Sequence, residues 1–203
     1  MALAKPVKTR RRGAMLEQAI INMAWKKLLA HGYTNLTMEM IATAAHTSRS
    51  VLARRWENKP ALVLAAIQHQ LAKHPRQVPD MGDVRSELLE YLKRLGELAP
   101  IFSTVNALLE NEAFRKKFAS PAELRMALRA GQPDNLDLIY ERAAIRGQMD
   151  LNRLNPAIQT LLRDLLRHHV MMYRCAPPES LRIAWVDTVF LPLVRPAGKS
   201  TRA

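Results

Sequence analysis

Apolar residues recur along this chain at the spacing of amphipathic helices, and no segment shows the strict alternation of a half-buried strand. The first pattern begins at Ala14 and runs to Gly32, which supplies a helix stop. Pro and Gly residues separate the later patterns. Together they predict helices over residues 14–32, 37–45, 48–58, 59–74, 81–98, 101–110, 122–129, 135–146, 156–174 and 178–191. The sequence therefore predicts an all-α fold.

Two of the predicted helices are short and lie close together, over residues 37–56. Thr37 is a candidate N-cap for the first and Ser48 for the second, with a turn of about three residues between them. This arrangement is typical of a helix-turn-helix, whose second helix enters the DNA major groove. The polar face of the second helix consists of Arg49, Ser50, Arg54 and Arg55. The apolar residues expected to hold the two helices at their angle are Ile41, Ala42, Ala45, Leu52 and Trp56.

Charge supports this interpretation because it is unevenly distributed. The formal net charge is +13, and residues 1–74 hold 12 Lys and Arg against 3 Asp and Glu. Residues 1–12 end in Arg10, Arg11 and Arg12 and have no periodicity, so we expect a flexible basic arm. A compact basic module is the electrostatic pattern of a polyanion binder. A merely soluble basic surface is the alternative that charge alone leaves open.

The last two predicted helices are apolar on more than one side, which predicts that two neighbours cover them. A subunit interface is one explanation, and a helix pair buried within one domain is the other. The interface interpretation assigns the contacts of a homodimer to Leu161, Leu165, Met172, Leu181, Trp185 and Val189.

The run AIINMAWKKLLAHGYTNLTMEMIATAAHTSRSVLARRWENKPAL resembles the N-terminal domain of the tetracycline-repressor (TetR) family. The matching positions are Gly32, Tyr33, Thr37, Ile41, Ala42, Ala45, Ser48, Leu52, Trp56 and Lys59. The C-terminal stretch is also similar, with Arg146 and Gly147 followed by two long helices that end in DTVFLPLV. Two positions depart from the family pattern. His46 replaces the turn glycine, and Ala53 replaces a tyrosine of the recognition helix that commonly touches a phosphate.

The resemblance implies a three-helix DNA-binding domain followed by a helical domain for ligand binding and dimerisation. It implies phosphate contacts from Thr37 and Lys59, base contacts from Arg49 and Ser50, and minor-groove contacts from the arm. The full set of predicted DNA-binding residues is Arg10, Arg11, Arg12, Thr37, Thr47, Ser48, Arg49, Ser50, Arg54, Arg55, Trp56 and Lys59. An apolar or amphipathic small molecule is the expected effector. The candidate pocket residues are Phe102, Phe114, Met126, Leu138, Tyr140, Met171 and Trp185.

We therefore expect a basic arm at 1–12, a DNA-binding domain at 13–58, a regulatory and dimerisation domain at 59–195 and a tail at 196–203. The expected function is ligand-responsive repression by a homodimer bound to a pseudo-palindromic operator. A nonspecific nucleoid or RNA-binding protein is the competing hypothesis.

The sequence shows no glycine-rich phosphate loop or catalytic constellation, so we expect no enzyme activity, cofactor or metal. Adjacent His168 and His169 diverge by about 100° on a helix and cannot share a metal. The single cysteine, Cys175, cannot form an internal disulfide, and no apolar run approaches the ~20 residues of a membrane span. We expect a cytoplasmic protein.

Overall fold

The computed structural model describes residues 13–74, 77–118, 120–129 and 135–196, and this part of the chain contains helices and no strand. The all-α prediction is confirmed. The α-helices are α1 Ala14–Asn35, α2 Met38–Ala44, α3 Arg49–Ala53, α4 Lys59–Ala72, α5 Val84–Glu97, α6 Ala99–Leu109, α7 Glu112–Lys117, α8 Pro121–Arg129, α9 Asn135–Ile145, α10 Pro156–Tyr173, α11 Glu179–Ala184 and α12 Leu191–Val194. The short 3₁₀ helix η1 is Leu151–Arg153, and the π-helical segment η2 is Trp185–Phe190.

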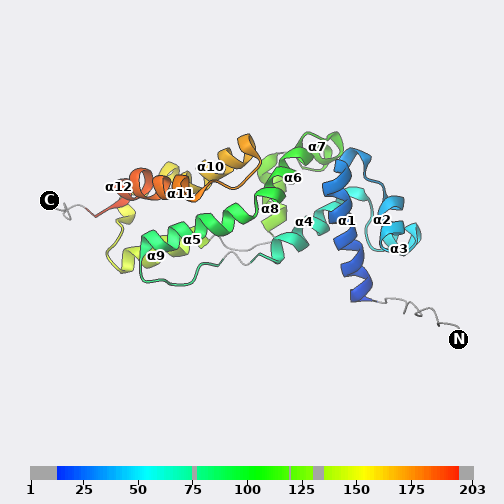
Figure 1. The fold of residues 1–203 in the computed structure, drawn as a ribbon, viewed down its shortest axis with the longest axis horizontal. Helices are drawn as coiled ribbons and strands as arrows, with labels where there is room; N and C mark the ends of the chain where they lie inside the picture. The colour runs from blue at the N-terminus through cyan, green and yellow to red at the C-terminus, as the bar shows by residue number, and fades with distance from the viewer. Residues whose placement is uncertain (1–12, 75–76, 119, 130–134, 197–203) are drawn as a thin grey trace, which may run out of the picture.

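The molecule is elongated (Figure 1). Helices α1, α2 and α3 lie at one end, and α4 leads from them toward the middle. Helices α6, α7 and α8 occupy the middle, while α5, α9, α10 and α11 form the other end. The arrangement separates a compact helical head from a longer helical body.

Side-chain caps start several helices where the sequence supplies short polar residues. Thr37 Oγ1 accepts a hydrogen bond from the Met40 amide at 3.1 Å, and Asn58 Oδ1 accepts one from the Ala61 amide at 2.9 Å. These contacts satisfy backbone amides that have no partner within the helix. Near the C-terminal end of α1, Gly32 has φ 69° and leaves the helical conformation, as the sequence predicts.

Two hydrophobic cores hold the molecule together. The first contains residues of α1 to α4 together with Phe114, Phe118 and Leu124 of the middle segment. The second lies among α5, α9, α10, η2 and α12. Phe102 of α6 packs against both cores, so it joins head to body.

Several predicted boundaries are wrong. The third helix ends at Ala53, not near residue 58, and α5 begins at Val84, not at 81. Helix α7 and η1 were not predicted, because segments of six and three residues carry too little periodicity.

The C-terminal helix extends three residues beyond the predicted end and contains a π-helical turn. Residues on either side of η2 keep right-handed helical angles, so α11, η2 and α12 form one continuous helix. Pro192 lies in α12 and has no amide hydrogen to donate. The wider turn before it accommodates this missing donor, and single π turns of this kind are common at functional sites.

An ionic cluster ties the loop that precedes α5 to α9. Glu87 is fully buried, and its carboxylate accepts hydrogen bonds from Arg142 Nη2 and Arg146 Nη1, each at 2.9 Å. The same carboxylate accepts the Met81 amide at 3.0 Å. Asp80 also pairs with Arg146. Because buried charges are costly without partners, this cluster fixes the loop against two helices.

Candidate nucleic-acid interface

Helices α2 and α3 meet at a turn closed by backbone hydrogen bonds. The Thr47 amide donates to the Ala42 carbonyl at 2.9 Å, and the His46 amide donates to the Thr43 carbonyl at 3.1 Å. This pair of bonds is a Schellman motif, which needs a left-handed residue after the helix. His46 takes that conformation with φ 55°. A left-handed histidine therefore stands where the family pattern has a glycine, and the turn keeps its Schellman hydrogen bonds.

Replacing His46 with Gly is expected to raise the free energy of unfolding by about 0.5–1 kcal/mol. A left-handed conformation costs a β-carbon residue about 1–2 kcal/mol, which exceeds the entropic cost of glycine in the unfolded chain. Chemical denaturation measures the change. The control is Lys26→Gly at an exposed position in the middle of α1, which should lower stability by about 1 kcal/mol. A destabilised His46→Gly would show that this turn is not strained.

The arginines of α3 and of the residues just after it have different environments. Arg49 Nε pairs with Glu39 Oε1 of α2 at 3.0 Å, although both side chains remain more than half exposed. Arg55 Nη1 pairs with Glu17 Oε2 of α1 at 2.9 Å. Arg54 is exposed and pairs with no other residue in the described part of the chain. Arg54 therefore has the guanidinium that is most available to an external acceptor.

The Ser48 and Ser50 hydroxyls lie 2.9 Å apart at the start of α3, and both residues are exposed. Ser48 occupies the N-cap position, but its hydroxyl makes no capping hydrogen bond. The predicted cap is therefore right in position and wrong in partner. The two hydroxyls hydrogen-bond to each other, which leaves one donor and further acceptor lone pairs available at the surface.

Lys59, which was predicted to contact a phosphate, also makes contacts within the protein. Its ammonium donates to the Tyr33 and Leu36 carbonyls at 3.0 and 2.9 Å and lies 4.1 Å from the centre of the Tyr33 ring. Partial burial lowers the pKa of Lys59. Tyr33 in turn packs edge-to-face on Phe114 at 4.9 Å. Lys59 thus holds the end of α1 and the start of α2 against the middle helices.

The structure gathers six of the predicted contact residues on one end of the head, around α2 and α3. Of these, Thr47 is half-buried and the other five are exposed: Thr37, Ser48, Arg49, Ser50 and Arg54. The prediction that Trp56 contacts DNA is wrong, because Trp56 is only 9% exposed and packs in the first core. Arg10, Arg11 and Arg12 lie outside the described residues. Sequence reasoning missed Glu17 and Glu39, which orient two of the arginines, because a pairing between helices has no local signal.

The predicted ligand pocket does not form as one cavity. Phe114 lies in the first core, whereas Tyr140 lies in the second and stacks on Phe190 at 5.5 Å. Three other members are exposed at the surface: Met126, Leu138 and Met171. Phe102 and Trp185 pack against the cores. These residues therefore do not line a common site.

The predicted interface residues of α10 and the C-terminal helix differ in burial. Met172 is 60% exposed and Val189 is 38% exposed. Leu161, Leu165, Leu181 and Trp185 are half-buried, and two of them, Leu161 and Trp185, pack against the second core. The neighbouring residues Leu162, Leu166 and Val186 are buried in that core. This chain therefore leaves part of the apolar surface of the two helices uncovered, at Met172 and Val189.

Two other structural features are absent among the described residues. No group of three or more His, Cys, Asp or Glu side chains among them is placed to hold a metal ion. Within the same residues, no helix is both long and apolar enough to cross a membrane.

Comparison with known proteins points to one family. The sequence profile described as "Bacterial regulatory proteins, tetR family" matches residues 20–66, which include α2 and α3. The chain is 26% identical over 199 residues to the DNA-binding transcriptional repressor TetR of Mycobacteroides abscessus, covering 93% of this chain and 98% of the relative. It is 29% identical over 199 residues to an uncharacterised HTH-type transcriptional regulator of Mycobacterium tuberculosis, covering 90% of each chain.

Solved structures share the fold. The fatty acid degradation regulator FadR from Bacillus halodurans has a TM-score of 0.61 at 16% identity and covers 90% of this chain and 97% of its own. The flavonoid-responsive regulator FrrA has a TM-score of 0.60 at 17% identity and covers 91% of this chain and all of its own. The sequence relatives extend the match beyond the helix-turn-helix to nearly the full length. In residues 20–66 the chain matches the TetR family of bacterial regulatory proteins, and over nearly its whole length it is similar to DNA-binding transcriptional regulators.

Proposed function

We propose that the chain forms a homodimer that binds a pseudo-palindromic operator, represses transcription and releases the DNA when a small molecule binds. Residues 13–58 would form the DNA-reading domain and residues 59–195 the regulatory and dimerisation domain. The main support is the exposed polar end of α3. There the Arg54 guanidinium offers hydrogen-bond donors, and the Ser48 and Ser50 hydroxyls offer acceptors and a donor. The uncovered apolar face of α10 and the C-terminal helix supports the dimer.

In the proposed DNA interface, the arginines differ in role because they differ in their ion pairs. Arg55 orients α3 against α1 through Glu17 and has only its remaining guanidinium donors for a phosphate. Lys59 likewise has one ammonium donor left for the proposed phosphate contact, after its bonds to two carbonyls. Arg54 is the proposed base-reading arginine, since bidentate contacts of arginine with guanine are the commonest specific contact.

Arg54→Ala is expected to relax sequence discrimination at one operator position by about 1–3 kcal/mol. Arg49→Ala provides the comparison, because Glu39 already neutralises that guanidinium. Its loss should have the smaller effect on discrimination. Binding measured against a set of single-base operator variants separates the two arginines. Equal losses on every operator variant would show that Arg54 contacts phosphate only.

The proposed function as a whole is tested by selecting genomic fragments with purified full-length protein at about 150 mM salt, where nonspecific binding is weak. Enrichment of one inverted repeat is expected. A pseudo-palindrome with half-sites one helical turn apart, ~34–36 Å, would fit two recognition helices in a dimer. Uniform recovery of fragments, or equal affinity for RNA, would favour the nonspecific nucleic-acid binder instead.

A further inference from the structure

Helix α5 contacts the C-terminal part of the chain at two separate places, the α10–α11 loop and the C-terminal helix. At one, Gly96 of α5 lies so close to the α10–α11 loop that an added β-carbon would be 3.4 Å from Ala176 Cβ. At the other, Arg85 donates two hydrogen bonds to the Asp187 carboxylate, at 2.7 and 2.8 Å. Bidentate pairs of this kind fix geometry well. The spacing of α5 and α11 between these two contacts is therefore set by the fold.

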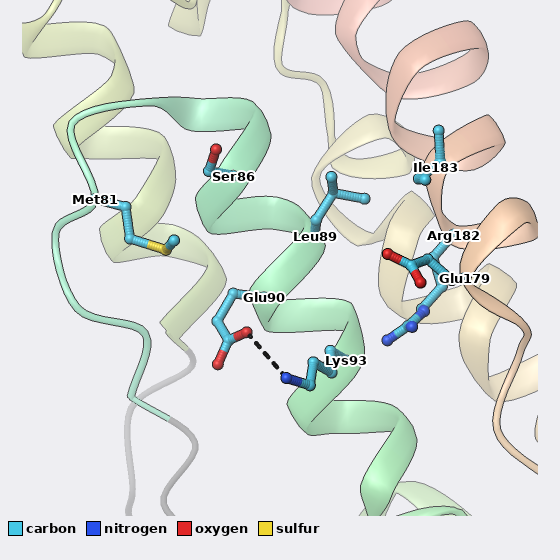
Figure 2. A pocket seen from close by; sticks show the side chains of 8 residues that line it. All are labelled: Met81, Ser86, Leu89, Glu90, Lys93, Glu179, Arg182 and Ile183. Carbon is cyan, nitrogen blue, oxygen red and sulfur yellow. Dashed lines mark ion pairs between the residues drawn. The ribbon is translucent and has the colours of Figure 1, made fainter.

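A groove with a volume of about 250 Å³ lies between the two contacts. It crosses α5, with Met81 of the preceding loop on one side and Ile183 of α11 on the other (Figure 2). Leu89 of α5 faces Ile183 across the groove. These three side chains give the groove an apolar part. Drug-sized ligands occupy about 300–1,000 Å³, so this volume suits a smaller molecule.

Two cationic side chains reach the groove, Lys93 from α5 and Arg182 from α11. The Arg182 Nε atom is buried and has no hydrogen-bond partner, and the Arg182 guanidinium pairs with no carboxylate of the described residues. A buried donor without an acceptor is destabilising, and each such group calls for an explanation. A bound molecule that supplies a hydrogen-bond acceptor is one such explanation.

The carboxylates beside the groove neutralise these cations only in part. Glu90 is shared by two cations, because Arg94 Nε donates to it at 2.7 Å and Lys93 forms a longer ion pair with it at 4.0 Å (Figure 2). Glu179 also lines the groove but is exposed and does not pair with Arg182. With Arg94 counted, three cations stand against the two carboxylates of Glu90 and Glu179. The electrostatics therefore favour an anion.

We propose that this groove binds a small organic acid, with its carboxylate on Arg182 and Lys93 and its short apolar part on Met81, Leu89 and Ile183. A carboxylate matches the fork of a guanidinium and supplies the acceptor that Arg182 lacks. The apolar part displaces water from the three hydrophobic side chains. The inference deepens the proposed ligand response by giving it a place and a ligand class, and its regulatory meaning rests on that proposal.

The test is a methyl NMR titration of the full-length protein with hexanoate, and hexan-1-ol serves as the uncharged control. Saturable shifts of the Met81, Leu89 and Ile183 methyl groups are expected with hexanoate, and at least 10-fold weaker binding with hexan-1-ol. Arg182→Gln should weaken hexanoate binding by about 10-fold or more, because it removes a charge-assisted pair. Arg115→Gln on α7, which is exposed and far along the chain from the groove, should leave the affinity unchanged.

Three results would overturn the inference: no saturable shift with hexanoate, equal affinity for hexan-1-ol, or an Arg182→Gln variant that binds hexanoate as the parent does. The assay contains no DNA, so its outcome is separate from that of the genomic-fragment selection. Operator binding without hexanoate binding would remove the groove proposal alone. Hexanoate binding without operator selection would remove the proposed DNA recognition alone.

Discussion

Glu87→Gln is expected to lower the free energy of unfolding by about 3 kcal/mol, because removing one partner of a buried ion pair leaves the other charge uncompensated. Glu87 is fully buried, and its carboxylate is shared by Arg142 and Arg146. Glutamine keeps the volume and an acceptor for the Met81 amide, so the loss reports the charge. Urea denaturation followed by circular dichroism measures the change.

Glu90→Gln is the matched control on the same helix. Glu90 is 25% exposed and pairs with Arg94 four residues later, so water screens much of the interaction. Its loss should cost less than about 1 kcal/mol. If the two substitutions destabilise equally, the buried cluster is not a principal contact between the α5 loop and α9.

Leu165→Glu is expected to convert the proposed dimer to a monomer and to reduce operator affinity by about 100-fold or more. A buried, unpaired carboxylate in an apolar interface is strongly unfavourable. A monomer also loses the gain of binding two half-sites together, which contributes about 10²–10⁴-fold. Analytical ultracentrifugation reports the oligomeric state, and fluorescence anisotropy reports the affinity for the selected operator.

The control places the same charge on another exposed apolar residue. Ile145 ends α9 and is 86% exposed, outside α10 and the C-terminal helix. Ile145→Glu should keep both the dimer and the operator affinity. Circular dichroism confirms that each variant retains its helices. A Leu165→Glu variant that is folded and still dimeric would place the subunit interface elsewhere.

The helix-turn-helix could be predicted almost completely from the sequence because its signals are local. Thr37 caps α2, and His46 takes the left-handed position that the family register implies. Trp56 shows the limit of that reasoning. A large aromatic residue at the end of a basic helix fits either a DNA contact or a core position, and only its burial in the first core distinguishes them.

The candidate ligand pocket was not predictable from residue type. Large apolar side chains such as Phe114 and Tyr140 serve equally in a cavity or in a core, and here they belong to different cores. The groove beside Arg182 gave no sequence signal either. It is formed by residues about 100 positions apart, whose proximity depends on how α5 meets α11.

By itself, the sequence determined the all-α fold, the capped helix-turn-helix, the basic head and the apolar outer face of the last two helices. Each depends on periodicity, capping residues or charge within a short stretch, so neighbouring residues along the chain suffice. Only the tertiary structure decided which arginines are paired, that Lys59 binds carbonyls of residues 33 and 36, and where Glu87 and Arg182 lie. These properties depend on contacts between distant helices, whose distances and burial are set by packing and not by local pattern.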